Sequence, residues 1–200
     1  MESSNIEILK EFAKATNRKI VDEKLPYPLT GIRTFRKYKE IIYIPNKSDN
    51  TSYFIWFSDP YAKIGFPTIF CGVFIPLPSE FKSKINIRNK NIIDKFNVFS
   101  KTEFYKTGNK HFDSKVVISG VINSPEENLL SQVKIQNQLL NALKIEPIIN
   151  ISLNEYKIDF IPELKNTPYL SVINPQNWCL EETKIEKLFE QIEKIKTLIN

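Results

Sequence analysis

The fold is decided by residues 107–143, TGNKHFDSKVVISGVINSPEENLLSQVKIQNQLLNAL, which predict a strand followed by a long amphipathic helix. The apolar run Val116-Val117-Ile118 predicts the strand. We expect Ser124 to cap the helix, with Pro125 in its first turn and Glu127 three residues after the cap. One face of this helix, expected over residues 124–144, carries Leu129, Leu130, Val133, Leu139, Leu140 and Leu143. A helix with such a face must pack against a sheet or another helix.

Further helices and strands are expected on both sides of this unit. Ser4 and Glu7 form a potential capping box, which predicts an opening helix over residues 4–17. Apolar residues spaced three and four apart predict a closing helix over residues 181–198. Strands are expected at 31–43, 53–57, 69–75, 85–87, 99–105 and 116–118, and a hairpin is expected from 148–153 and 156–161. The chain therefore predicts one α+β domain over residues 1–200, with a largely antiparallel sheet of about six to eight strands.

The apolar pattern of the strands predicts their depth in the sheet. Tyr53–Phe57, Ile69–Ile75 and Val116–Ile118 are apolar throughout, which indicates central strands covered on both faces. Ile85 and Ile87 alternate with polar residues, which indicates a strand with one face in water.

The closing helix has two interpretations. Its apolar stripe either packs across its own domain or forms the seam of a homodimer, and its two heptads are too few to establish a coiled coil. We prefer the first interpretation and keep the helix as a possible interaction appendage.

Charge and cysteine usage restrict the class of protein only weakly. The net charge of +5 comes mainly from lysine, which is weak evidence for nucleic acid.

Cys71 and Cys179 have no metal-ligand spacing and are expected to be buried free thiols, with a disulfide as the alternative. The polar residues 1–5 and the proline-interrupted apolar run 66–78 predict a cytoplasmic protein without a membrane segment.

Titratable residues offer few candidates for catalysis. His111 is the only histidine, which excludes zinc sites that need several histidines, and we expect no metal or other cofactor. His111 and Asp113 lie close enough in sequence to pair as a general base, but a solvated histidine and a turn-fixing aspartate are the preferred interpretation. The five glycines lack the spacing of a phosphate-binding loop, which excludes Walker-type and Rossmann-type nucleotide sites.

The densest feature of the chain is a group of aromatic residues between positions 53 and 74. Large aromatics on a loop bury poorly without a partner, so Trp56, Tyr61 and Phe66 are candidates for a partner-binding or ligand-binding surface. With Arg33 and Arg36 on the preceding segment, the same group could stack single-stranded nucleic acid. That interpretation is disfavoured because strand aromatics more often form a core.

Residues 108–148 resemble an uncharacterised bacterial module in which a Phe-Asp pair opens a strand that is followed by a leucine-rich helix and a closing hairpin. The matching residues are Phe112-Asp113, Val116-Val117-Ile118, Ser124-Pro125-Glu126, Leu129-Leu130, Gln136, Leu139-Leu140 and Leu143. Members of the module are often attached to membrane helices, which this sequence lacks. The resemblance implies an α+β fold and assigns no activity.

These patterns together predict a non-enzymatic binding protein of a bacterial cell, either a small adaptor or an immunity-type protein that blocks a toxin. Its partner would be another protein. The competing prediction is an enzyme or small-ligand protein whose site is assembled from distant residues, with His111, Asp113, Asp59 and Tyr61 as candidates. Nucleic-acid binding is the third prediction.

Overall fold

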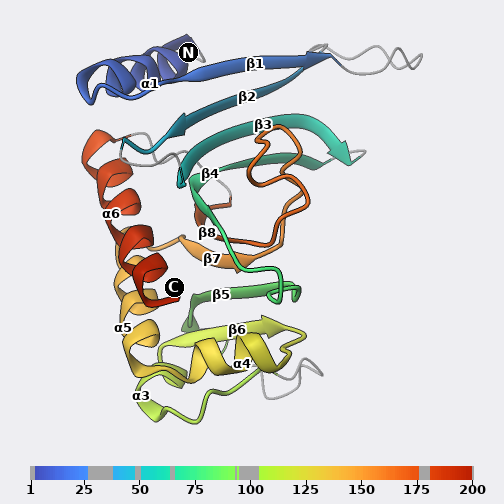
Figure 1. Ribbon diagram of the computed structural model, residues 1–200, viewed down its shortest axis with the longest axis vertical. Helices are drawn as coiled ribbons and strands as arrows, with labels where there is room; N and C mark the ends of the chain where they lie inside the picture. The colour runs from blue at the N-terminus through green and yellow to red at the C-terminus, as the bar shows by residue number, and fades with distance from the viewer. Residues whose placement is uncertain are drawn as a thin grey trace.

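An eight-stranded antiparallel sheet forms the centre of the molecule in a computed structural model (Figure 1), which confirms the predicted α+β class. The structure describes residues 3–26, 38–47, 51–63, 66–92, 94, 104–175 and 181–199. The strand order is β1-β2-β3-β4-β8-β7-β5-β6. The strands are β1 (Val21–Pro26), β2 (Tyr38–Pro45), β3 (Tyr53–Lys63), β4 (Phe66–Pro76), β5 (Ile85–Asn89), β6 (Val116–Gly120), β7 (Asn150–Leu153) and β8 (Tyr169–Asn174).

Helices cover one face of the sheet. They are α1 (Ser3–Ala15), α3 (Lys110–Asp113), α4 (Ser124–Ser131), α5 (Val133–Ala142) and α6 (Glu182–Ile199). Figure 1 shows α5 and α6 stacked along one side of the strands, with α1 beside β1. The apolar stripe of α6, including Ile185, Phe189 and Ile192, is buried in the main core. This stripe therefore packs across its own domain and is not available as the seam of a homodimer.

The other face of the sheet is covered by the long connection between β7 and β8, residues 154–168. Ile158, Ile161 and Leu164 of this connection pack against aromatic residues of β3 and β4 in a second core. The predicted hairpin of 148–153 with 156–161 is therefore wrong, because β7 pairs with β8 and β5 instead. The alternating apolar residues of 156–161 fill a core as an irregular segment and form no strand.

The predicted continuous helix over 124–144 consists of two helices, α4 and α5, with a break at Gln132. Gln136 stabilises the break, because its Nε2 donates to Leu130 O at 2.8 Å and its Oε1 accepts from Asn109 Nδ2 at 2.5 Å. The N-cap of α4 is Asn123 and has no side-chain capping bond, so the predicted cap at Ser124 is wrong.

Other boundaries differ from the sequence-based prediction. Phe112 and Asp113 end the short helix α3, so the Phe-Asp pair does not open the strand, which begins at Val116. β6 comes last in the order of the described strands although it was predicted to be central, and Tyr105 forms an isolated bridge with its Ile118. Strands β1 and β8 were not predicted, and of the predicted strand 99–105 the structure describes an isolated bridge at Tyr105. Residues 31–37 and 95–103, on which parts of two predicted strands fall, lie outside the described residues.

No helix in the described part of the chain is long and apolar enough to cross a bilayer. Cys71 is buried, as expected, and Cys179 lies outside the described residues.

Candidate binding pocket

The predicted aromatic surface is divided between the two faces of the sheet. Successive side chains of a strand point to opposite faces, so Phe54 and Trp56 enter the helix-covered core while Tyr53 and Phe57 face the β7–β8 connection. The side chain of Trp56 is only 3% exposed. The interpretation of Trp56 as a surface anchor for a partner is therefore corrected, because β2 and β4 flank it within the sheet and the helices cover it.

The other members of that proposed surface are placed only in part. Tyr61 lies in β3 and Phe66 begins β4, so the segment 58–67, predicted to be a loop, is mainly an extension of two paired strands. The side chains of Tyr61 and Phe66 are outside the described part of the structure, as are Arg33 and Arg36 entirely.

The alternative polar site of His111, Asp113 and Asp59 does not assemble. Asp59 lies on β3, where it pairs with Lys39 Nζ at 3.0 Å. Five strand spacings separate β3 from β6, next to which α3 lies, and this corresponds to about 24 Å at the usual interstrand distance. The three side chains therefore cannot act on one substrate atom.

The side chains of Asp113 and His111 also contact different residues within their own segment. The Asp113 carboxylate accepts hydrogen bonds from Thr107 N at 3.1 Å, Thr107 Oγ1 at 3.0 Å and Gly108 N at 3.1 Å. Gly108 has a φ of 85°, a conformation that favours glycine, so Asp113 fixes the turn. The exposed ring of His111 contacts Lys115, with Nε2 3.0 Å from Nζ.

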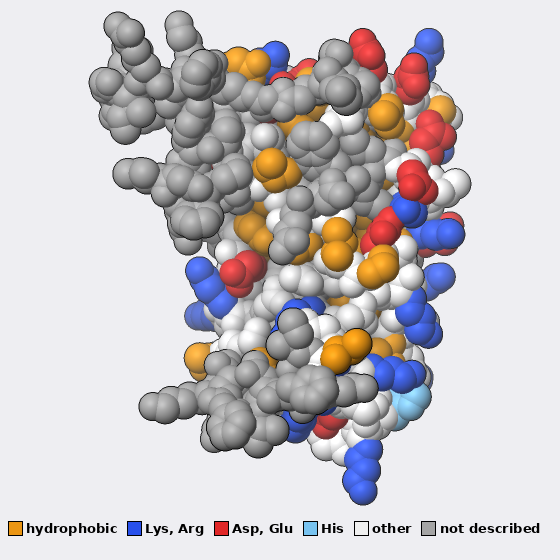
Figure 2. Space-filling view, turned by 180° about the vertical axis from the view of Figure 1, so that it is seen from behind, with side chains coloured by type: hydrophobic (Ala, Val, Ile, Leu, Met, Phe, Trp, Pro, Cys, Tyr) orange, Lys and Arg blue, Asp and Glu red, His pale blue; other side chains and the backbone are white. Residues whose placement is uncertain are grey.

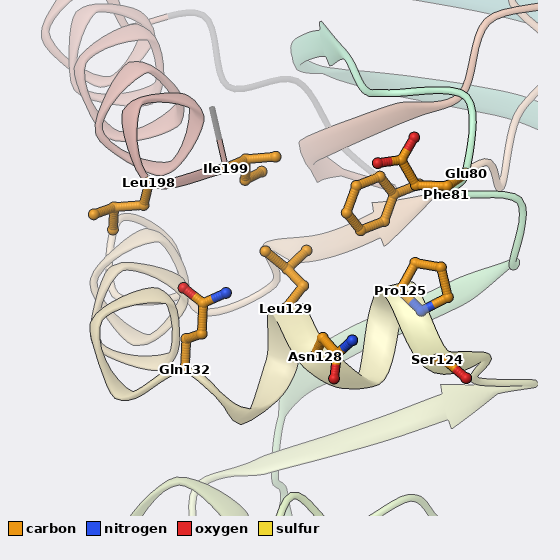
Figure 3. Close-up of a pocket in the computed structure, with 9 residues that line it drawn as sticks. All are labelled: Glu80, Phe81, Ser124, Pro125, Asn128, Leu129, Gln132, Leu198 and Ile199. Carbon is orange, nitrogen blue, oxygen red and sulfur yellow. The ribbon is translucent and has the colours of Figure 1, made fainter.

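A pocket of about 370 Å³, open to solvent, lies between α4, the C-terminal end of α6 and the β4–β5 connection (Figure 3). Its lining residues are Glu80, Phe81, Ser124, Pro125, Asn128, Leu129, Gln132, Leu198 and Ile199. Phe81 and Leu129 are buried members of the main core, and Leu198 and Ile199 are partly buried beside it. Asn128 and Gln132 are exposed and supply amide donors and acceptors. The pocket thus has an apolar floor and a polar rim.

Side-chain hydrogen bonds fix the wall of the pocket that the β4–β5 connection provides. Asn154 Nδ2 donates to Phe81 O and to Ser83 O, both at 2.9 Å. The buried Glu126 carboxylate accepts from Ser83 N at 3.0 Å, and Asn123 Nδ2 donates to Ser83 Oγ at 2.8 Å. Because these bonds tie the connection to α4 and to the end of β7, the wall is in place before any ligand arrives.

The opposite wall is the end of α6, a helix whose middle is hydrogen-bonded to α5. Gln191 Nε2 donates to Gln138 O at 3.0 Å and to Gln138 Oε1 at 2.7 Å. Three segments distant in sequence therefore meet in fixed positions, which sequence reasoning missed. The sequence placed Leu129 on an apolar helix face but gave no signal that the end of α6 would lie beside it.

Histidine, cysteine, aspartate and glutamate do not gather in groups of three or more that could hold a metal ion anywhere in the described residues. Comparison of the chain with protein-family models, with curated proteins and with solved structures found no match.

Proposed function

We propose that this chain is a non-catalytic binding protein of the bacterial cytoplasm, of the adaptor or immunity type, and that it holds a segment of another protein in the α4–α6 pocket. The observation that carries the proposal is the pocket itself, with its preformed walls, apolar floor and amide rim. Its volume of about 370 Å³ is near the lower end of the range for ligand sites, which suits one or two apolar side chains of a peptide.

The rim chemistry supports a peptide as the occupant. The side chains of Asn128 and Gln132 each offer a donor and an acceptor, which is the pairing that a peptide bond requires. Among the described residues that line the pocket, Glu80 is the only ionisable one. A floor that takes an apolar side chain, next to amides that hold the neighbouring backbone, resembles the pockets in which anchor residues of interfaces are buried.

The test uses a displayed library of linear peptides selected against the immobilised full-length protein. Selected peptides should share an apolar anchor residue and should bind the Asn128→Arg variant at least about tenfold more weakly, because the longer charged side chain fills the rim. Asn137→Arg is the matched control, since Asn137 is an exposed amide on α5 that does not line the pocket. Failure to select peptides, or equal losses in both variants, would refute the proposal.

A small-molecule ligand is the second candidate, and the same pocket volume favours it. A ligand that binds only the folded state raises the melting temperature by mass action. A thermal-shift screen of small metabolites with the wild-type and Asn128→Arg proteins distinguishes the two functions. A stabilising compound whose effect disappears in Asn128→Arg would assign the pocket to a small ligand.

A further inference from the structure

Three segments that are distant in sequence meet along one border of the sheet, formed by strand ends. There β5 ends and β6 and β7 begin. Lys90 N donates to Lys115 O at 2.8 Å, which joins the end of β5 to the segment between α3 and β6. Asn89 Nδ2 donates to Leu143 O at 3.0 Å and to Pro147 O at 3.5 Å, which joins it to the connection between α5 and β7. These bonds place the three segments on one continuous surface.

Two aliphatic side chains on these segments are exposed to solvent. Ile92 is 72% exposed and Ile148 is 43% exposed. The described residues next to Ile92 are hydrogen-bonded: the Asp94 carboxylate accepts two hydrogen bonds from the Arg88 guanidinium, at 2.6 and 2.7 Å. Asn91 N also donates to Asp94 Oδ2 at 2.7 Å, and Asp94 N donates to Asn91 Oδ1 at 2.9 Å. These bonds hold Asn91 and Asp94, the described residues that flank Ile92, and the side chain of Ile92 itself is open to water.

Four lysines lie on the same three segments as these aliphatic side chains. Lys110, Lys115 and Lys144 are exposed and Lys90 is half-buried. In the view from behind, Figure 2 shows basic side chains gathered along the edge that carries the histidine, with hydrophobic side chains next to them.

The carboxylates of these segments make their hydrogen bonds and ion pairs with other residues, although Asp94 also attracts Lys90 electrostatically. Asp113 accepts hydrogen bonds from Thr107 and Gly108, Asp94 pairs with Arg88, and Glu146 pairs with Lys184. Among the described residues, no carboxylate forms an ion pair with Lys90, Lys110, Lys115 or Lys144. The surface therefore combines an excess of positive charge, carried mainly by Lys110, Lys115 and Lys144, with exposed apolar side chains.

We propose that this surface, which we name the lysine edge and define as Lys90, Ile92, Lys110, Lys115, Lys144 and Ile148, docks an acidic segment of a partner protein. Carboxylates of the segment would pair with the lysines, and one or two of its apolar side chains would cover Ile92 and Ile148. The proposal rests on the proposed function, since it names the chemistry of a protein partner, but it involves no residue of the α4–α6 pocket.

Charge and shape favour an acidic protein segment over nucleic acid. Lysine is a point charge without the planar fork with which arginine pairs with phosphate, so the lysine edge lacks the geometry that recognises a phosphate backbone bidentately. Its exposed apolar residues are aliphatic and offer no ring on which a base could stack. Carboxylates placed around an apolar side chain complement both features, and opposite charge also accelerates association.

The experiment measures binding of a fluorescein-labelled peptide of about 15 residues, in which leucines are separated by runs of glutamate, by fluorescence anisotropy at about 50 mM salt. The full-length protein should bind it, and Lys110→Glu with Lys115→Glu should weaken binding at least about tenfold. The matched control is Lys47→Glu with Lys165→Glu, which reverses the charge of two exposed lysines on other connections. This variant should bind the peptide as the wild-type protein does.

The aliphatic contribution has its own variant and control. Ile92→Ser should weaken binding about fivefold to tenfold, because the partner would no longer bury that side chain. Val121→Ser should have no effect, since Val121 is 75% exposed but lies on the connection between β6 and α4. Circular dichroism of each variant shows whether its fold is retained.

Several results would overturn the proposal. These are the absence of peptide binding, equal losses in the control variants, and equal binding of a peptide whose leucines are replaced by serine. Tighter binding of a single-stranded oligonucleotide that is lost in the same lysine variants would assign the surface to nucleic acid. Loss of peptide binding in Asn128→Arg with the lysine variants unaffected would locate the partner in the pocket alone, so the two proposals fail separately.

Discussion

A buried pair of serines between β7 and β8 provides a quantitative test of the sheet register. Ser152 and Ser171 are partners across the two strands, both are fully buried, and their Oγ atoms are 2.7 Å apart. Ser171 Oγ also lies 3.3 Å from Ser152 O, to which it can donate. The pair lies on the face covered by residues 154–168, because Tyr169 and Ile173 of the same strand belong to the second core.

The expected free energies follow from which hydroxyl keeps a partner. Ser171→Ala removes both bonds and leaves the Ser152 hydroxyl buried without one, which should cost about 2 kcal/mol of unfolding free energy. Ser152→Ala should cost about 1 kcal/mol, because Ser171 can still donate to Ser152 O. The double substitution leaves no hydroxyl unpaired and should cost about 1 kcal/mol, less than Ser171→Ala alone. The coupling between the sites is then about 2 kcal/mol.

Urea unfolding of the four proteins at fixed pH measures this coupling, and equal m-values confirm that the free energies are comparable. Ser114→Ala and Ser131→Ala form the control cycle. These exposed serines donate to His111 O and Asn128 O respectively, so their effects should add. Additive effects at Ser152 and Ser171, within about 0.3 kcal/mol, would mean that the two hydroxyls are not paired and that the β7–β8 register is wrong.

Three further predictions concern the core and the turn that carries Ile92. Gly72→Ala should lower the free energy of unfolding, measured in urea, by at least about 2 kcal/mol, because an added Cβ would collide with the backbone of β8 at Val172. Trp56→Ala should cost about 3–5 kcal/mol in the same assay, since that side chain fills the helix-covered core; a loss below about 1 kcal/mol would contradict this placement. The hydrogen bond from the Arg88 guanidinium holds the pKa of the Asp94 carboxyl at about 2, so the ion pair should stabilise the folded protein above about pH 4 and be lost as the pH falls toward 2. A carbon-13 NMR titration of Asp94 should give this low midpoint, and Arg88→Lys should raise it; an unchanged midpoint would exclude the bidentate pair as its cause.

The sequence alone predicted the elements that carry a strong periodic pattern. The apolar stripes of α1 and α6 and the continuous apolar runs of β3 and β4 were recognised because a helix repeats about every 3.6 residues and a doubly covered strand is apolar throughout. The alternation at Ile85 and Ile87 also correctly indicated a strand with a half-exposed face. The second face of the sheet was not predicted, because its cover, residues 154–168, has the alternation of a strand and forms no strand.

The sequence therefore determined that this chain forms an antiparallel sheet packed by amphipathic helices, since that information lies in the spacing of neighbouring residues. Only the tertiary structure decided that Trp56 is core, that the long helix breaks at Gln132 and that α6 ends beside α4. These outcomes depend on contacts between segments far apart in the chain, such as the bond from Asn109 to Gln136, whose partners cannot be recognised from local spacing. The pocket and the lysine edge are both products of such contacts, which is why residue types and spacing alone revealed neither.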